Sequence, residues 1–234
     1  MPEFIVDNQI IHYEIRGIEE TKLKTPLLML HGNGEDMHLF DAIVPHIEDT
    51  KHIVLMDSRC HGESHPAEGG SIHLSYSVMA DDAIALMDSL GYKEYDIVGY
   101  SDGAIIALIM ARKTYAVRKI IAIGVNANPD GLNPAAIRHI KADYRKAKRK
   151  KDERNMELAR LMLEEPNITL ADLSRIVAEV TILLGKKDPF IDRKHSEAIA
   201  DALPHCSHML IDGAGHGIPT THPRAVIDCI RTLL

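Results

Sequence analysis

The stretch Tyr95–Ala111, YDIVGYSDGAIIALIMA, decides the fold of this chain. It begins as a strand-like run, turns through GYSDG at residues 99–103, and continues as Ala104–Ala111, which is apolar on nearly every side. A segment that is apolar all round predicts a helix buried on several sides. A serine on a sharp strand-to-helix turn needs Gly on both sides, because the strained backbone and its neighbours leave no room for a Cβ. The stretch therefore predicts a strand, a tight turn that exposes Ser101, and a buried helix.

Strand-like runs alternate with helical patterns on both sides of this stretch. They comprise an opening hairpin around Asp7-Asn8 and the later runs Pro26–Leu30, His52–Met56, Lys119–Ile123, Val180–Leu184 and His208–Ile211. Most of them are continuously apolar, as is typical of strands buried on both faces. We therefore expect an α/β fold, in which helices cover both faces of a mostly parallel sheet.

The alternation breaks between Asn126 and Glu179. Helical spacing resumes after Asn133-Pro134, which predicts an N-cap and a first helical residue, and two shorter helices are expected around Met156–Leu163 and Leu170–Ile176. We expect residues 126–179 to form a small helical insertion. The core would then consist of residues 1–125 and 180–234.

Charge is distributed unevenly along the chain. The formal net charge is -7, yet the segment from Arg138 to Arg154 holds nine basic residues against three acidic ones. A solvated helix face is the expected role of this segment. Attraction of an anionic substrate or surface is the alternative. Nucleic acid is not an expected partner, because the acidic remainder would repel phosphate and the chain has no Trp for a stacking platform.

The composition points to one globular domain of 234 residues with 45% hydrophobic residues. Its longest apolar run, Ala104–Ala111, is far shorter than the roughly 18 to 20 residues of a membrane span. Neither a signal-like segment nor a C-x-x-C motif is seen, so we expect a cytoplasmic protein with reduced thiols. No metal site and no cofactor are expected, since no His and carboxylate set has ligand spacing.

A reactive serine needs a base and usually a carboxylate that orients this base. Asp188 follows the run Val180–Leu184, and His216 stands 28 residues further on within GAGHG, just after another strand-like run. Both positions, like that of Ser101, lie at the carboxyl end of a strand, the edge where open parallel sheets bind ligands. Asp192 and Asp212 are the rival acids, and Asp188 is preferred because Asp192 begins the next helix and Asp212 is too near His216.

Acyl transfer also needs donors for the oxyanion. His31-Gly32-Asn33-Gly34 is a glycine-rich turn directly after Pro26–Leu30, at the same edge. We expect the backbone N–H groups of Asn33 and Asp102 to be the two donors. Gly32, Tyr100 and Asp102 are the candidate substrate-binding residues. The carboxyl group of Asp102 would favour a cationic substrate, unless it only caps the helix start.

Five motifs in this order make the chain resemble a small member of the α/β-hydrolase superfamily: HGNGED, DSRCHGES, GYSDG, LGKKD and GAGHG. The resemblance covers residues 4–125 and 180–234, and it implies eight strands with the second antiparallel and a helical cap at 126–179. In DSRCHGES the chain departs from the family, which commonly has Gly at the position of Cys60. Asp57, Arg59 and His61 of this motif are expected to fix the loop, with contact between His61 and substrate as the alternative.

The expected activity is that of a cofactor-free serine hydrolase on a small ester or related acyl compound, carboxylesterase-like in class. Ser101 would be the nucleophile, His216 the general base and Asp188 its orienting acid. Carbon–carbon bond hydrolysis and acyl transfer or perhydrolysis would use the same residues. A ligand-binding receptor of the same fold, with little turnover, is the alternative outside enzymes. The sequence does not predict an oligomeric state.

Overall fold

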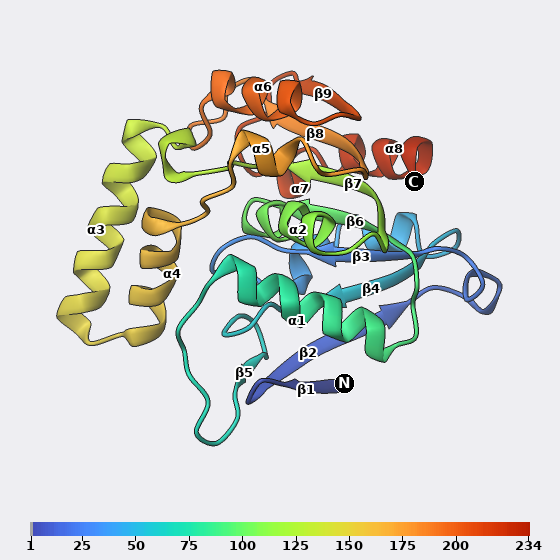
Figure 1. Cartoon of the computed structure of the whole chain (residues 1–234), viewed down its shortest axis with the longest axis horizontal. Coiled ribbons are helices and arrows are strands. Elements are labelled where there is room, and N and C mark those ends of the chain that lie inside the picture. Colours follow the sequence, from blue (N-terminus) through green and yellow to red (C-terminus); the bar gives the residue numbers. More distant parts are fainter. Residues whose placement is uncertain (1) are drawn as a thin grey trace.

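The computed structural model describes residues 2–234, which form one mostly parallel sheet with helices on both faces (Figure 1). The strand order is β1-β2-β4-β3-β6-β7-β8-β9, and a short β5 pairs with β2. The strands are β1 (Glu3–Val6), β2 (Gln9–Arg16), β3 (Pro26–Leu30), β4 (His52–Met56), β5 (His65–Pro66), β6 (Tyr95–Tyr100), β7 (Val117–Ile123), β8 (Glu179–Gly185) and β9 (Cys206–Ile211). From β4 to β9 every pairing along this order is parallel, whereas β2 runs antiparallel to β1 and β4. The predicted fold class is confirmed.

The opening hairpin turns at the two residues that the sequence indicates. Asp7 and Asn8 both have positive φ, 46° and 54°. A two-residue hairpin turn with both central residues in this region matches the right-handed twist of its strands, and Asp and Asn tolerate it better than most residues. The turn therefore fixes the register in which Val6 pairs with Gln9.

Alternate residues of the central strands pack on opposite faces of the sheet. Leu28 belongs to the cluster that α1 (Tyr76–Ser89), α2 (Asp102–Lys113) and α6 (Arg193–Ala202) cover, whereas Met29 packs with α7 (Ile218–Thr221) and α8 (Pro223–Leu233). This is the period of two expected for a strand between two helical layers. Within α2, every residue from Asp102 to Ala111 is buried, as its all-round apolar sequence predicts.

The segment between β7 and β8 carries three helices, α3 (Pro134–Lys150), α4 (Glu153–Glu164) and α5 (Leu170–Leu173). Figure 1 shows α3 and α4 side by side beyond the ends of the strands, at the left of the view. Ile140 of α3 and Ala159 of α4 share a small apolar cluster with Leu184 and Ile191. All nine basic residues between 138 and 154 are exposed, as on a solvated helix face.

Three details of this segment differ from the expectation. The first is that α5 ends at Leu173 and not at Ile176. Asn133 precedes Pro134 at the start of α3, but its side chain does not cap the helix; its amide instead approaches the carbonyl oxygen of Asp188 at 3.5 Å. Helix α4 begins at Glu153, three residues earlier than its apolar spacing indicates, because the carboxylate of Asp152 accepts a hydrogen bond from the Asn155 N–H and caps it.

Within residues 2–234, no helix has both the length and the apolar composition needed to cross a membrane.

Candidate active site

Ser101 stands between β6 and α2 with a positive φ, in a backbone conformation with φ 52° and ψ −113°. Its N–H donates to the carbonyl oxygen of Ile123 on β7 at 2.8 Å, which fixes the turn to the sheet. A Cβ on Gly99 would overlap the backbone of Gly103, and a Cβ on Gly103 would overlap the carbonyl of Leu30. Both glycines of GYSDG are therefore required by backbone packing, and Ser101 is held in a conformation that non-glycine residues rarely adopt.

The three side chains that the sequence singles out meet at the carboxyl ends of their strands. Nε2 of His216 lies 3.2 Å from Oγ of Ser101, and Nδ1 of the same ring lies 2.8 Å from Oδ2 of Asp188. A carboxylate only accepts, so the hydrogen between Asp188 and His216 belongs to Nδ1, and the lone pair of Nε2 then faces the serine hydroxyl. This arrangement has the geometry of a nucleophile, a base and an orienting acid.

Asp188 is held by its own chain segment. The N–H groups of Phe190 and Ile191 donate to Oδ1 at 2.7 and 3.0 Å, so that Oδ2 is left for His216, and the side chain is only 2% exposed. The rival acids are occupied elsewhere. Asp192 caps α6 by accepting from the His195 N–H, and Asp212 forms an exposed ion pair with Lys186.

The imidazole of His216 is fixed between neighbouring rings. Phe190 stacks on it with the ring centroids 5.1 Å apart and an interplanar angle of 28°, and Tyr100 lies 5.3 Å away on a tilted plane. On another side the ring passes over Gly124, where an added Cβ would come within 2.8 Å of the imidazole. Phe190 is a contact that no sequence signal indicated beyond its place two residues after Asp188.

Two backbone N–H groups lie in the turns beside Ser101, those of Asn33 and Asp102, and within residues 2–234 neither donates a hydrogen bond. The carbonyl of the peptide before Asn33 accepts from Nδ1 of His31 at 2.8 Å, and the Ser101 carbonyl accepts from the Ala104 and Ile105 N–H groups. Since a peptide group is planar, fixing its carbonyl also fixes the opposite N–H. Both turns therefore present an oriented, free donor.

The side chains of the same two residues are joined. Nδ2 of Asn33 donates to Oδ2 of Asp102 at 2.8 Å and also to the carbonyl oxygen of Leu158 on α4 at 3.3 Å. Burial raises the pKa of Asp102 to about 6, although the hydrogen bonds from Asn33 and from the Tyr76 hydroxyl oppose the shift. The carboxyl group of Asp102 thus bonds across to the other turn, rather than to the N–H groups at the start of its own helix.

A small cavity of about 20 Å³ adjoins Ser101 and His216. Its wall includes Asp102, Tyr76 of α1, Phe190, and Ile140 and Met162 from the helical insertion. Of the three candidate substrate-binding residues, Asp102 lines this cavity, whereas Gly32 packs against the ring of Tyr100 and its N–H donates to the carboxylate of Glu35 at 3.2 Å. Tyr76, Met162 and Glu35 are site neighbours that sequence reasoning missed.

The loop after β4 is held by contacts among its own residues. Asp57 accepts from the N–H groups of Met37 and Glu63, Arg59 forms a two-bond ion pair with Asp82, and Nδ1 of His61 donates to the Arg59 carbonyl. Burial lowers the pKa of His61 to about 3, so its ring is neutral at physiological pH. These contacts give the three residues the loop-fixing geometry that the sequence indicated.

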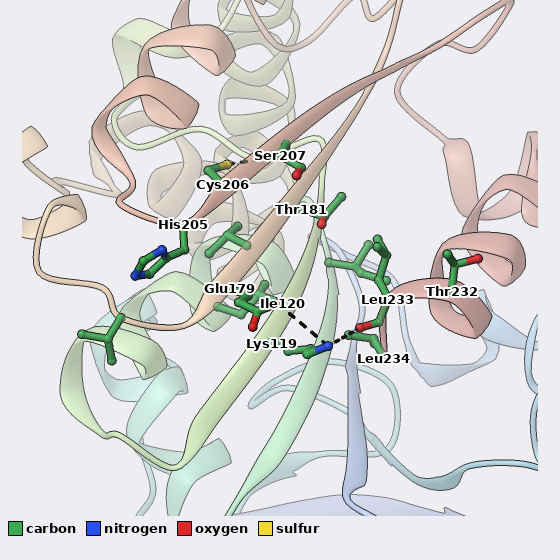
Figure 2. A pocket seen from close by; sticks show the side chains of 13 residues that line it. Lys119, Ile120, Glu179, Thr181, His205, Cys206, Ser207, Thr232, Leu233 and Leu234 are labelled. Carbon is green, nitrogen blue, oxygen red and sulfur yellow. Dashed lines mark hydrogen bonds and ion pairs between the residues drawn. The ribbon is translucent and has the colours of Figure 1, made fainter.

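A much larger hollow lies far from this site along the strands. It has a volume of about 640 Å³ and is bordered by residues near the starts of β7, β8 and β9 and by the end of α8 (Figure 2). Figure 2 shows Lys119 at its edge, where Nζ donates to the carbonyl oxygen of Leu233 at 2.7 Å. Ser101, Asp188 and His216 follow the opposite ends of their strands, so size alone does not identify the active site.

In the described part of the chain, residues 2–234, no group of three or more His, Cys, Asp or Glu side chains is arranged to hold a metal ion.

Comparison with known proteins decides the family. A profile described as the α/β-hydrolase fold matches residues 25–150, slightly more than half of the chain. The chain belongs to the α/β-hydrolase family. The strand order, the turn at Ser101 and the helices on both faces of the sheet agree with this assignment.

Several known proteins are similar to this α/β hydrolase. A Haemophilus influenzae protein provisionally named an esterase/lipase is 24% identical, over 98% of this chain and 90% of that protein. The human serine hydrolase BPHL is 27% identical, over 63% of this chain and 57% of that protein. The crystal structure of MGS-M2, an α/β hydrolase from a deep-sea metagenome, superposes with a TM-score of 0.84 at 18% identity and covers 98% of this chain and 95% of the other. The chain is thus an α/β hydrolase that is similar to proteins named as an esterase/lipase and as a serine hydrolase.

Proposed function

We propose that this protein is a serine hydrolase that cleaves an ester of a small molecule through an acyl-enzyme on Ser101. The observation that carries the proposal is the unbroken chain of contacts from Oγ of Ser101 to His216 at 3.2 Å and on to Asp188 at 2.8 Å. A serine hydroxyl becomes a good nucleophile only when a base removes its proton during attack. His216, with its Nε2 lone pair directed at Oγ, has the position and the tautomer for that task.

The reaction would proceed in two halves. Oγ of Ser101 attacks the ester carbonyl while Nε2 of His216 takes its proton, and the imidazolium then gives this proton to the departing alcohol oxygen. In the second half, His216 takes a proton from water, which attacks the acyl-enzyme and releases the acid and free Ser101. Asp188, buried and held by two N–H donors, would stabilise the imidazolium that forms in each half.

The N–H groups of Asn33 and Asp102 would bind the oxygen that becomes negative in each tetrahedral intermediate. In this family the donors are the N–H of the residue after the nucleophile and one from the loop after the third strand, which are the positions of Asp102 and Asn33. Loss of a single donor of this kind typically costs on the order of 10²–10³ in kcat. In both peptide groups the carbonyl oxygen accepts a hydrogen bond, which holds the N–H on the opposite side in place. This supports the role, because donors that need no reorientation stabilise the intermediate best.

Residues 126–179 would serve as a cap over this site, with the core formed by residues 1–125 and 180–234. Ile140 and Met162 of the insertion line the cavity beside Ser101, and the carbonyl of Leu158 bonds to Asn33.

A cavity of about 20 Å³ holds little more than one water molecule. We therefore expect short acyl groups, such as acetyl, to be preferred. A series of p-nitrophenyl esters tests this expectation: kcat/KM should fall from acetate to hexanoate, and a rise along the series would contradict it.

The test of the proposed reaction is hydrolysis of p-nitrophenyl acetate by Ser101→Ala. This variant should lose at least about 10³-fold in kcat with an unchanged melting temperature, because it removes only the attacking oxygen. Ser58→Ala is the matched control. Its hydroxyl is buried near the same edge of the sheet and has no hydrogen-bond partner within residues 2–234, so its removal should leave kcat unchanged. Full activity of Ser101→Ala would refute the proposal.

A further inference from the structure

The amide of Asn33 occupies an unusual position, because it joins the two turns whose backbone donors the proposed reaction needs. Its Nδ2 donates to the carboxylate of Asp102 at 2.8 Å, and the two residues are 69 positions apart in sequence. Each of these residues also supplies one of the free N–H groups beside Ser101. The bond between their side chains therefore spans the gap between the two donors.

The same amide also reaches the helical insertion. An Asn side-chain NH₂ group has two hydrogens, and the second is directed at the carbonyl oxygen of Leu158 on α4 at 3.3 Å. Asp102 in turn is buried against the hydroxyl of Tyr76 on α1. The link is thus partly buried among α1, α2 and α4, where a hydrogen bond is stronger than in water and an unpaired group is costly.

We propose that the Asn33 side chain is a positioning residue of the oxyanion hole, which sets the spacing of its two N–H donors by binding the carboxylate of Asp102. The inference rests on the proposed function, since it assigns a role toward an oxyanion that forms only if Ser101 attacks a carbonyl. The side-chain bond itself adds no donor to the site. It acts through the backbones of Asn33 and Asp102, whose distance from each other it restrains.

The role has a specific kinetic signature. Donors placed too far apart bind the developing oxyanion poorly and bind the neutral substrate almost as well as before, so kcat falls while KM is retained. A trifluoromethyl ketone measures the same property at equilibrium, because Ser101 adds to its carbonyl and leaves an oxyanion in the hole. The inhibition constant of such a ketone should therefore weaken by the factor that kcat loses.

The experiment compares the wild type with Asn33→Ala, Asp102→Ala, their double variant and Asp102→Asn at pH 8, where Asp102 of the wild type is ionised. Each single Ala variant should lose about 10- to 100-fold in kcat with KM within about 3-fold, and ketone binding should weaken in parallel. The double variant should be no worse than either single variant, because both remove one bond. Asp102→Asn keeps an oxygen that accepts from Asn33, so it should recover most of the loss. Asn155→Ala is the matched control, since its side chain donates to Asp152 at the outer end of α4 and to no other group in the described part of the chain.

Several results would overturn the inference. Additive losses in the double variant would show that the two side chains act independently. A raised KM with unchanged ketone binding would show that the two side chains contribute to binding of the substrate and not of the oxyanion. If Asp102→Asn is as impaired as Asp102→Ala, the shared hydrogen bond has no role. If Asn33→Ala does not fold, Asn33→Leu replaces it, because it has a similar shape without the N–H donor and adds no charge beside Asp102. A wild type that hydrolyses no ester and does not bind the ketone would instead contradict the proposed function.

Discussion

Two turns at the carboxyl edge of the sheet hold a non-glycine residue at positive φ, Ser101 after β6 at φ 52° and Cys60 after β4 at φ 61°. The Ser101 hydroxyl faces His216 and adjoins a cavity. The Cys60 side chain is buried, burial raises the pKa of its thiol, and its carbonyl accepts a hydrogen bond from Arg154 of α4 at 2.6 Å. A strained turn thus positions a side chain in both places. Only the turn with a base beside it has the arrangement of a reactive site.

Replacement of the histidine beside each turn, His216 or His61, should give the largest difference in kcat. His216→Ala should lower kcat on p-nitrophenyl acetate by about 10³-fold or more, because it removes the base from Ser101. His61→Ala, in the turn of Cys60, should lower the free energy of unfolding and leave kcat within about 3-fold, since the His61 ring is buried and, among residues 2–234, its hydrogen bond goes to the Arg59 carbonyl alone. Steady-state kinetics with urea unfolding measures both effects. Comparable losses of kcat in the two variants would remove the distinction between the turns.

The next largest effect is expected on the free energy of unfolding, because the backbone around Ser101 is crowded. Gly103→Ala should lower the free energy of unfolding by about 3 kcal/mol or more, because its Cβ would overlap the carbonyl of Leu30 and neither backbone can move freely. Gly34→Ala is the control in the neighbouring turn. Gly34 has φ +73° but open space around it, so only the backbone conformation is penalised, by about 1 kcal/mol. Equal costs for the two variants in urea unfolding would show that the turn at Ser101 is not sterically constrained.

Asp102 makes the turn at Ser101 sensitive to pH, in contrast to the turn at Cys60, whose thiol has a raised pKa and stays neutral below pH 8. Burial raises the pKa of Asp102 from 3.8 to about 6, so between these values the folded chain holds a proton that the unfolded chain has lost. Stability therefore falls as pH rises through this window. Relative to Asp102→Asn, the wild type should lose at most about 3 kcal/mol of unfolding free energy between pH 4 and pH 7. A difference in unfolding free energy between the two proteins that does not change with pH would contradict the raised pKa of Asp102.

Cys60→Gly should have the smallest effect. Glycine relieves the positive φ of this residue, but it also removes a buried side chain, and the two contributions oppose each other. The free energy of unfolding should change by less than about 1 kcal/mol, with kcat unchanged. A loss of activity in this variant would show that the turn after β4 contributes more to the reaction than its contacts indicate.

Patterns repeated along the chain made the fold predictable. Continuous apolar runs located the buried strands, and the all-round apolar segment Ala104–Ala111 located α2, because burial on every side leaves no polar positions. Boundaries were less predictable where side chains decide them. Asp152 starts α4 early through a cap, and Asn133 turns its amide toward Asp188 instead of capping α3. The choice of Asn133 depends on a neighbour that is distant in sequence, whereas Asp152 is a local cap that lies outside the apolar spacing.

The geometry of the candidate site was predictable to a similar extent. Ser101, Asp188 and His216 could be selected because each follows a strand of a parallel sheet, and such ends converge at one edge. The ring of Phe190 on His216, the wall formed by Met162 and the bond between Asn33 and Asp102 were not predictable. They depend on how the helical insertion and the loops pack onto this edge, which no local pattern encodes.

Activation of Ser101 as a nucleophile can be measured directly by labelling with a fluorophosphonate and mapping the modified peptide by mass spectrometry. An activated serine displaces fluoride and forms a bond from Oγ to phosphorus. We expect one adduct per chain, on the peptide that contains Ser101, and no adduct in His216→Ala. Label on another residue, or ester hydrolysis by a protein whose Ser101 stays unmodified, would contradict it.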